Sequence, residues 1–201
     1  MNDLELIPAF ELGLWNAWIL VLLSFLTVPV AGLLINKEAM EKFGESESIE
    51  YSERERISGK IISFLSPIFI VYSIFLPIKL GTTWFYMGLS IVFLAYIIGF
   101  ISVVSFVTTS IGRLVTKGTY SISRNPICLA GVLLDLGVGI ACTSWIYLLY
   151  AILRLILMDN MVEAEERFLL KKYGNTYRNY KEKTPKWIGI TKYKKFDSLS
   201  F

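Results

Sequence analysis

Apolar runs alternate with charged segments along the chain, and this alternation predicts its structural elements. A run of about 20 apolar residues can cross a bilayer as an α-helix, which rises about 1.5 Å per residue. We therefore expect an all-α fold, a polytopic membrane helical bundle with five transmembrane helices in a single domain, residues 1–201. The expected spans are 14–35, 61–78, 84–107, 126–142 and 145–158. The last two are shorter than ~20 residues, so we expect them to pack inside the bundle or to thin the bilayer locally.

The fifth helix is expected to continue beyond the membrane. Its pattern runs on to Tyr173, and Gly174 is typical of the residue that follows a helix end. Thr176 is then expected to cap a second short helix, which would run to Lys183 before Pro185. These segments predict cytoplasmic amphipathic helices after the last span.

Composition agrees with a membrane protein. Hydrophobic residues make up 54% of the chain, above the ~45–50% of a typical soluble domain. The first apolar run follows acidic residues and precedes no small-residue cleavage site, so we interpret it as a membrane anchor rather than a signal peptide. Cys128 and Cys142 lie near opposite ends of one predicted helix, and we expect no disulfide between them. Histidine is absent, which removes the commonest metal ligand and general base.

The basic residues predict an orientation. No Lys or Arg precedes the first span, whereas the loop 36–60 has five and the loop 108–125 has three. By the positive-inside rule, the N-terminus lies outside and the C-terminus is cytoplasmic. The tryptophans expected at the outer interface form an aromatic belt: Trp15, Trp18, Trp84 and Trp145.

Two opposite charges fall inside the predicted membrane region. Asp135 and Arg154 lie at similar distances from the turn between the fourth and fifth spans, so they are expected at similar depth. A charge at the bilayer centre costs about 2.5–3.5 kcal/mol on insertion scales, and pairing is expected. Both a hairpin-locking ion pair and a role in a polar ligand pocket remain open.

Three glutamates near the end of the fifth helix differ in helical phase. Glu165 shares a face with Arg154 and interrupts an apolar stripe, and Glu166 lies at the edge of that stripe. Glu163 lies on another side, where Arg167 at the i+4 position is expected to pair with it. We therefore expect Glu165 to face inward, where an acid needs a cationic partner.

The pair Asn125-Pro126 predicts a helix start. Asn is a favoured N-cap residue and Pro is favoured at the first helical position, which alone would explain the pair. The same geometry leaves free N–H groups and a positive dipole end beside Arg124. Such a position can bind a carboxylate or a phosphate.

Together these residues resemble the integral membrane methyltransferases, a superfamily that includes isoprenylcysteine carboxyl methyltransferases and phospholipid N-methyltransferases. The matching positions are Gly118, Tyr120, Ser123, Arg124, Asn125, Pro126, Gly131, Glu165, Glu166, Leu169, Tyr173, Gly174, Tyr177 and Tyr180. The resemblance implies an S-adenosylmethionine site over residues 118–187, on the cytoplasmic side. It implies cofactor-binding roles for Tyr120, Arg124, Asn125, Pro126, Glu165 and Glu166. The sequence departs from the family at Asn125, where many members have His, and at Cys128, where Tyr is usual.

The expected function is therefore S-adenosylmethionine-dependent methyl transfer to a lipid or lipidated substrate. Arg154 and Glu165 are the candidate catalytic residues. A carboxylate acceptor needs no base, whereas an amine acceptor does, and both remain open. The alternatives are a sterol-reductase-like enzyme that uses NADPH and a non-catalytic membrane scaffold. Expected partners are membrane lipids and the substrate, with no nucleic acid and no metal.

Overall fold

The computed structural model describes residues 11–23, 44 and 49–188. The elements within these ranges are α3 (Glu53–Ile74), α4 (Thr83–Thr108), the 3-10 helix η2 (Gly118–Ser121), α5 (Pro126–Ala141), α6 (Trp145–Tyr173) and α7 (Asn175–Lys183). A further short helical stretch begins at residue 18. Among the described residues, β-pairing is limited to one isolated bridge between Asn16 and Pro77. The expected all-α class is confirmed for this part of the chain.

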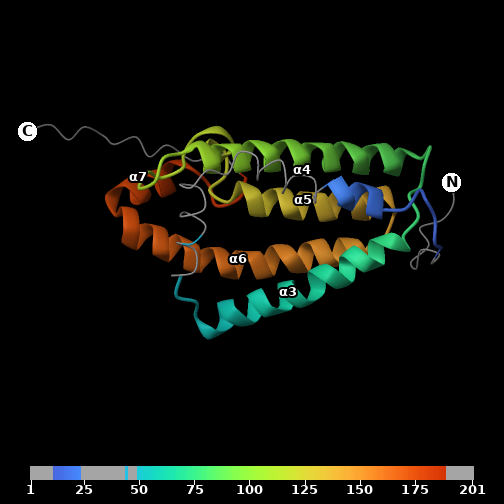
Figure 1. Cartoon of the computed structure of the whole chain (residues 1–201), viewed down its shortest axis with the longest axis horizontal. Coiled ribbons are helices and arrows are strands. Elements are labelled where there is room, and N and C mark those ends of the chain that lie inside the picture. Colours follow the sequence, from blue (N-terminus) through green and yellow to red (C-terminus); the bar gives the residue numbers. More distant parts are fainter. Residues whose placement is uncertain (1–10, 24–43, 45–48, 189–201) are drawn as a thin grey trace, which may run out of the picture.

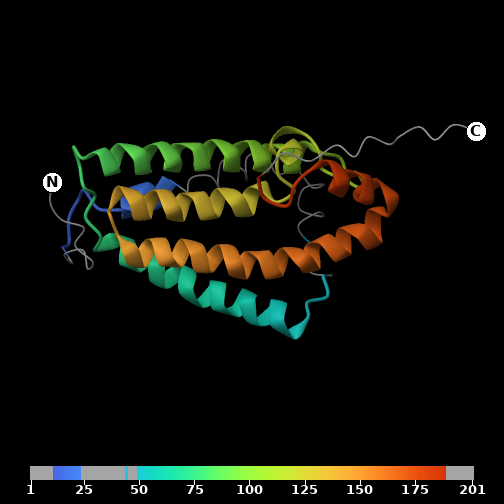
Figure 2. The same cartoon turned by 180° about the vertical axis from the view of Figure 1, so that it is seen from behind.

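The four long helices lie side by side in the order α4, α5, α6, α3 (Figures 1 and 2). Helix α5 packs against both α4 and α6, and α3 packs on the other side of α6, from which its first turns diverge. Helix α7 follows α6 at one end of the bundle, beside η2 and the start of α5. This end of the bundle holds the polar residues singled out by the sequence.

Three helices are long and apolar enough to cross a membrane: α3, α4 and α6. Helix α5 is apolar but shorter, as expected for the fourth span. The expected span 14–35 falls largely outside the described residues, so the count of five spans stays a prediction. The expected second span, 61–78, was placed too late in the chain. Its helix starts at Glu53, because Ser52 and Glu55 form a capping box there, and it ends before Pro77, which cannot continue it.

Helix ends elsewhere follow local signals. Thr82 caps α4 by accepting a hydrogen bond from the Phe85 N–H. Gly174 has a positive φ of 52° and terminates α6. The expectation that Thr176 caps the next helix was wrong: Gly174 itself is the N-cap of α7, which starts at Asn175. One residue serves both helices, so no segment remains for a separate cap.

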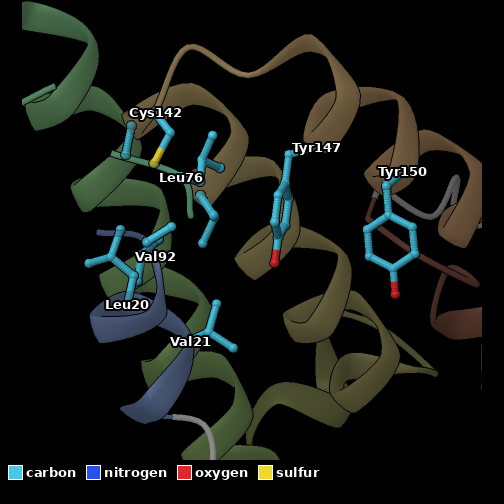
Figure 3. Close-up of a cluster of buried hydrophobic side chains, with 10 residues drawn as sticks. Leu20, Val21, Leu76, Val92, Cys142, Tyr147 and Tyr150 are labelled. Atoms are coloured by element: carbon cyan, nitrogen blue, oxygen red, sulfur yellow. The ribbon is translucent and has the colours of Figure 1, made fainter. Parts of the chain in front are cut away.

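The buried core lies at the opposite end of the bundle, where the short helical stretch meets α4, α5 and α6. Figure 3 shows part of it, with Leu20, Val21, Leu76, Val92, Cys142, Tyr147 and Tyr150. Cys142 and Cys128 are both free thiols, as expected.

Helices α4 and α5 approach closely at Gly88. A Cβ atom at Gly88 would lie 2.3 Å from the backbone nitrogen of Ala141 and 2.5 Å from the carbonyl oxygen of Gly137. Only glycine allows this distance between the two backbones, a form of packing common between membrane helices. The contact fixes α5 against α4 near the core end.

Candidate functional site

A cavity of about 350 Å³ opens at the α7 end of the bundle. Its walls come from the start of α5, the second half of α6, the segment before η2 and the residues that precede α3. The lining residues are Ile49, Tyr51, Phe106, Arg113, Leu114, Val115, Tyr120, Arg124, Asn125, Pro126, Ile127, Cys128, Glu165, Phe168, Leu169, Lys172, Tyr173 and Tyr180. Aromatic and aliphatic side chains predominate, with a few polar groups, as is usual in small-molecule sites.

Most of the residues predicted to bind a cofactor meet at this cavity. Tyr120, Arg124, Asn125, Pro126 and Glu165 all line it, although they come from η2, the following turn and α6. The predicted residues Glu166 and Arg154 do not line it. Both residues are instead held in ion pairs with other residues of the protein.

Glu165 is the acidic residue of the cavity wall. Its side chain is half-buried, and it forms no ion pair or hydrogen bond with any other described residue. A carboxylate that is partly removed from water requires a compensating charge or hydrogen bond. The inward orientation expected from helical phase is therefore present, and the compensating cation is not supplied by the described protein residues.

Glu163 points away from the cavity, as expected, but its predicted partner was wrong. Its side chain is 60% exposed, and its closest cationic atom is Lys186 Nζ at 3.9 Å. Arg167 instead donates two hydrogen bonds to the Glu55 carboxylate, at 2.6 Å and 2.8 Å. The start of α3 brings Glu55 against α6. Arg167 therefore pairs with the buried Glu55, which is distant in the sequence, and not with the exposed Glu163.

Glu166 is the centre of a buried ion-pair network. Its Oε1 lies 2.8 Å from Arg124 Nη1, and its Oε2 accepts a hydrogen bond of 2.7 Å from Lys181 Nζ. The Glu166 and Arg124 side chains are only 10% and 9% exposed. The network joins the turn before α5 to α6 and α7. Sequence reasoning missed Lys181, which carries no motif and lies on the exposed side of a short helix.

Arg154 and Asp135 form the expected ion pair, with 2.6 Å between Nη1 and Oδ2. The Arg154 guanidinium rests on Gly131 of α5, where an added Cβ would lie 2.9 Å from Nη2. Arg154 Nε is buried and makes no hydrogen bond with a described residue. The pair thus joins α5 to α6, as expected of a hairpin-locking contact, and the buried Nε–H is left without an acceptor among the described residues.

Asn125 occupies the N-cap position of α5 and Pro126 the first helical position, as expected. The Asn125 side chain makes no capping hydrogen bond to this helix, and its Nδ2 donates to the backbone oxygen of Lys186 at 3.0 Å. The first turn of α5 therefore has no side-chain acceptor. Ile127 and Cys128, the residues of this turn after Pro126, both line the cavity. The uncapped helix start gives the cavity a pole that favours anions.

Tyr180 of α7 lines the cavity, and Tyr177 on the same helix is buried. Tyr180 Oη donates a hydrogen bond of 2.7 Å to the backbone oxygen of Tyr120. Burial, followed by the charge of Glu166, raises the pKa of Tyr177 to about 12. Burial also raises the pKa of Tyr180 well above its ordinary value. These phenols are neutral at neutral pH, so they are poor general bases.

Comparison with known proteins identifies one family. The model of the family described as Phospholipid methyltransferase matches residues 78–176. The match covers α4, η2, α5 and α6, including Tyr120, Arg124 and Glu165, and it ends before Tyr180. A search of curated proteins finds no match. The resemblance to integral membrane methyltransferases is thereby confirmed.

Proposed function

Because residues 78–176 match the model of the phospholipid methyltransferase family, we propose that the protein is an S-adenosylmethionine-dependent methyltransferase acting on a lipid or lipidated substrate. The observation that carries the proposal is the pairing of two poles in one cavity. Glu165 supplies an acid without a partner among the described residues, and the start of α5 supplies N–H groups to which no described side chain is bonded as a cap.

The residues of the cavity fit the methyl donor. That molecule has an amino-acid end with an ammonium group and a carboxylate, and an adenosine end with an aromatic base. A positively charged sulfonium joins the two ends. Glu165 would hold the cationic part, while Ile127 and Cys128 N–H groups, with Arg124 beside them, would hold the carboxylate. A volume of about 350 Å³ falls within the ~300–1,000 Å³ of small-molecule sites. The donor supplies an electrophilic methyl group when bound.

The chain's own contribution is alignment and exclusion of water. Aromatic walls from Phe106, Phe168 and Tyr173 surround the cavity, and such walls keep water from competing with the acceptor. No histidine is available as a base. A carboxylate acceptor needs no proton removed, whereas an amine acceptor would pass its proton to a carboxylate or to water. Both acceptor classes remain within the proposal.

Arg154 has a proposed role on the acceptor side. Its Nη1 is held by Asp135, and its buried Nε retains one unused donor. A lipid acceptor that enters between α5 and α6 would bring a polar group to this donor. Glu166 is proposed to act on the cofactor through Arg124, which lines the cavity and which Glu166 holds in place.

The proposal includes an orientation. The excess of Lys and Arg in the loops 36–60 and 108–125 supports a cytoplasmic position for the end of the bundle that carries the cavity. The N-terminus would then lie outside and the C-terminus would be cytoplasmic. The methyl donor would enter from the cytoplasm and the acceptor from the lipid.

Calorimetry on the purified full-length protein in detergent tests the proposal. The ligands are S-adenosylhomocysteine and, in a separate titration, the reduced nicotinamide cofactor. We expect binding of S-adenosylhomocysteine and none of the nicotinamide. Binding of the nicotinamide alone would replace the proposal with a reductase, and binding of neither would favour a scaffold.

A further inference from the structure

The four residues that follow α7, numbers 184–187, form a strap that packs against the turn before α5, and this turn is part of the cavity wall. The strap lies between the turn before α5 and the middle of α6, and Thr184 within it is buried. It contacts both walls through specific polar groups. These residues lie beyond the segment matched by the family.

On one side the strap holds the turn that leads into α5. The Arg124 N–H donates a hydrogen bond of 3.0 Å to the Pro185 oxygen. The Lys186 oxygen accepts two hydrogen bonds, one of 3.0 Å from Asn125 Nδ2 and one of 3.3 Å from Ser123 Oγ. The whole turn is therefore fixed to the strap's backbone.

On the other side the strap is anchored to α6 chiefly by Asp159, since the only other α6 acid near Lys186 Nζ among the described residues is Glu163, at 3.9 Å. Lys186 Nζ lies 2.6 Å from Asp159 Oδ1 and donates a hydrogen bond of 3.0 Å to the Asp159 backbone oxygen. Trp187 Nε1 donates to the same Oδ1 at 2.9 Å. Asp159 precedes Glu165 by six residues on the same helix, or about 9 Å along its axis. The anchor therefore ties the turn before α5 to the helix that carries Glu165.

The strap also binds the Asn125 side chain, which could otherwise compete with an anion for the free N–H groups in the first turn of α5. An Asn at the N-cap ordinarily accepts a hydrogen bond from the first turn of its helix. Here the Lys186 oxygen binds the Asn125 amide, and the first turn stays uncapped. Arg124, whose Nε is buried without a hydrogen bond among the described residues, lies beside this turn and lines the same cavity.

We propose that Lys186 and Asp159 are positioning residues that keep the start of α5 open for the carboxylate of the methyl donor, at a fixed separation from Glu165. This inference rests on the proposed function, because it assumes that the donor occupies the cavity. It predicts a specific defect: loss of the anchor weakens recognition of the amino-acid end of the ligand and leaves its adenosine end unaffected.

The test uses the full-length protein in lipid nanodiscs and compares two ligands by calorimetry. S-adenosylhomocysteine carries the amino-acid end, and 5′-methylthioadenosine lacks it. For Lys186→Met and Asp159→Ala we expect the affinity for S-adenosylhomocysteine to fall about tenfold and that for 5′-methylthioadenosine to change less than about twofold. Lys186→Arg should restore most of the loss, since it keeps the cation. Glu163→Gln is the matched control, because it also removes an acid of α6 near Lys186 Nζ, but one that is exposed and 3.9 Å away. This variant should change the affinity for neither ligand.

Hydrogen exchange provides a second readout on the same variants. S-adenosylhomocysteine should protect the peptide that spans residues 125–130 in the wild type and in Lys186→Arg, and protect it less in Lys186→Met. Equal loss of affinity for both ligands, or undiminished protection in Lys186→Met, would overturn the inference. Failure of the wild type to bind S-adenosylhomocysteine would instead overturn the proposed function.

Discussion

Glu165 and Glu166 are neighbours in the sequence, yet α6 directs them to different surroundings. Glu165 lines the cavity without a described partner, whereas Glu166 is buried between Arg124 and Lys181. Successive residues on a helix point about 100° apart, which explains the separation. Glu165 is therefore available to a ligand, whereas Glu166 is paired with basic residues of the protein.

Glu165→Gln should weaken the binding of S-adenosylhomocysteine about ten- to a hundredfold. The substitution keeps the shape and removes a charged hydrogen bond worth about 1.5–3 kcal/mol. Calorimetry on the purified variant measures the change. Glu163→Gln is the control and should change the affinity less than about twofold. Equal effects of the two substitutions would mean that the ligand does not contact Glu165.

Glu166→Ala should lower the free energy of unfolding by about 3–5 kcal/mol, because it leaves the Arg124 cation buried without its partner. Lys181→Ala should cost about 1 kcal/mol or less, since the Lys181 side chain is 49% exposed. Thermal unfolding of both variants in the same detergent provides the comparison. A larger loss for Lys181→Ala would contradict the network described here.

Asp135→Ala should destabilise the protein by about 3–5 kcal/mol, because it leaves the Arg154 guanidinium unpaired between α5 and α6. Adding Arg154→Ala should recover part of that loss. A double-mutant cycle on unfolding free energies measures the coupling between the two residues. Strict additivity would show that the ion pair contributes nothing.

Gly88→Ala should destabilise the contact between α4 and α5, because its Cβ would meet backbone atoms at 2.3 Å and 2.5 Å. Gly99→Ala is the matched control on the same helix, where the nearest atom is the Ala130 Cβ at 3.5 Å, an ordinary contact. The control should be neutral or slightly stabilising, since Ala favours helix more than Gly does. Melting temperatures report both changes, and a neutral Gly88→Ala would rule out the close approach.

Topology is tested by cysteine labelling in sealed cells. The background replaces Cys128 and Cys142, and single cysteines are introduced at Ser48 and Ser198, which lie outside the described residues. Both positions are predicted to be cytoplasmic, so an impermeant reagent should label neither. Labelling of either position from outside would contradict the five-span arrangement.

Local sequence signals predicted much of the fold. Apolar runs located the long helices, and the residue count from one turn placed Asp135 opposite Arg154. Gly174 ended α6 as its type predicts. Helical phase also directed Glu165 and Glu163 to different sides. These features depend on neighbouring residues, whose geometry is set by the helix itself.

Contacts between segments that are distant in the sequence could not be predicted from local patterns. Arg167 pairs with Glu55 across 112 residues rather than with Glu163 four residues away, and Asn125 binds a backbone oxygen 61 residues later. A carbonyl acceptor has no sequence signature, because every residue has one. The role of Lys186 therefore emerges only when its main chain and its side chain are seen to serve different helices.

In the proposed membrane arrangement, the short length of α5 would set the depth at which water meets lipid. Its 16 residues cover about 24 Å, less than the ~30 Å thickness of a bilayer's hydrocarbon core. Helix α4 has 26 residues and extends past the start of α5, and η2 folds back against its last turns through the contact of Ser102 with Thr119. In that arrangement the start of α5, with the cavity beside it, would lie below the membrane surface. A donor dissolved in water and an acceptor dissolved in lipid would meet there at one depth, without either leaving its own phase.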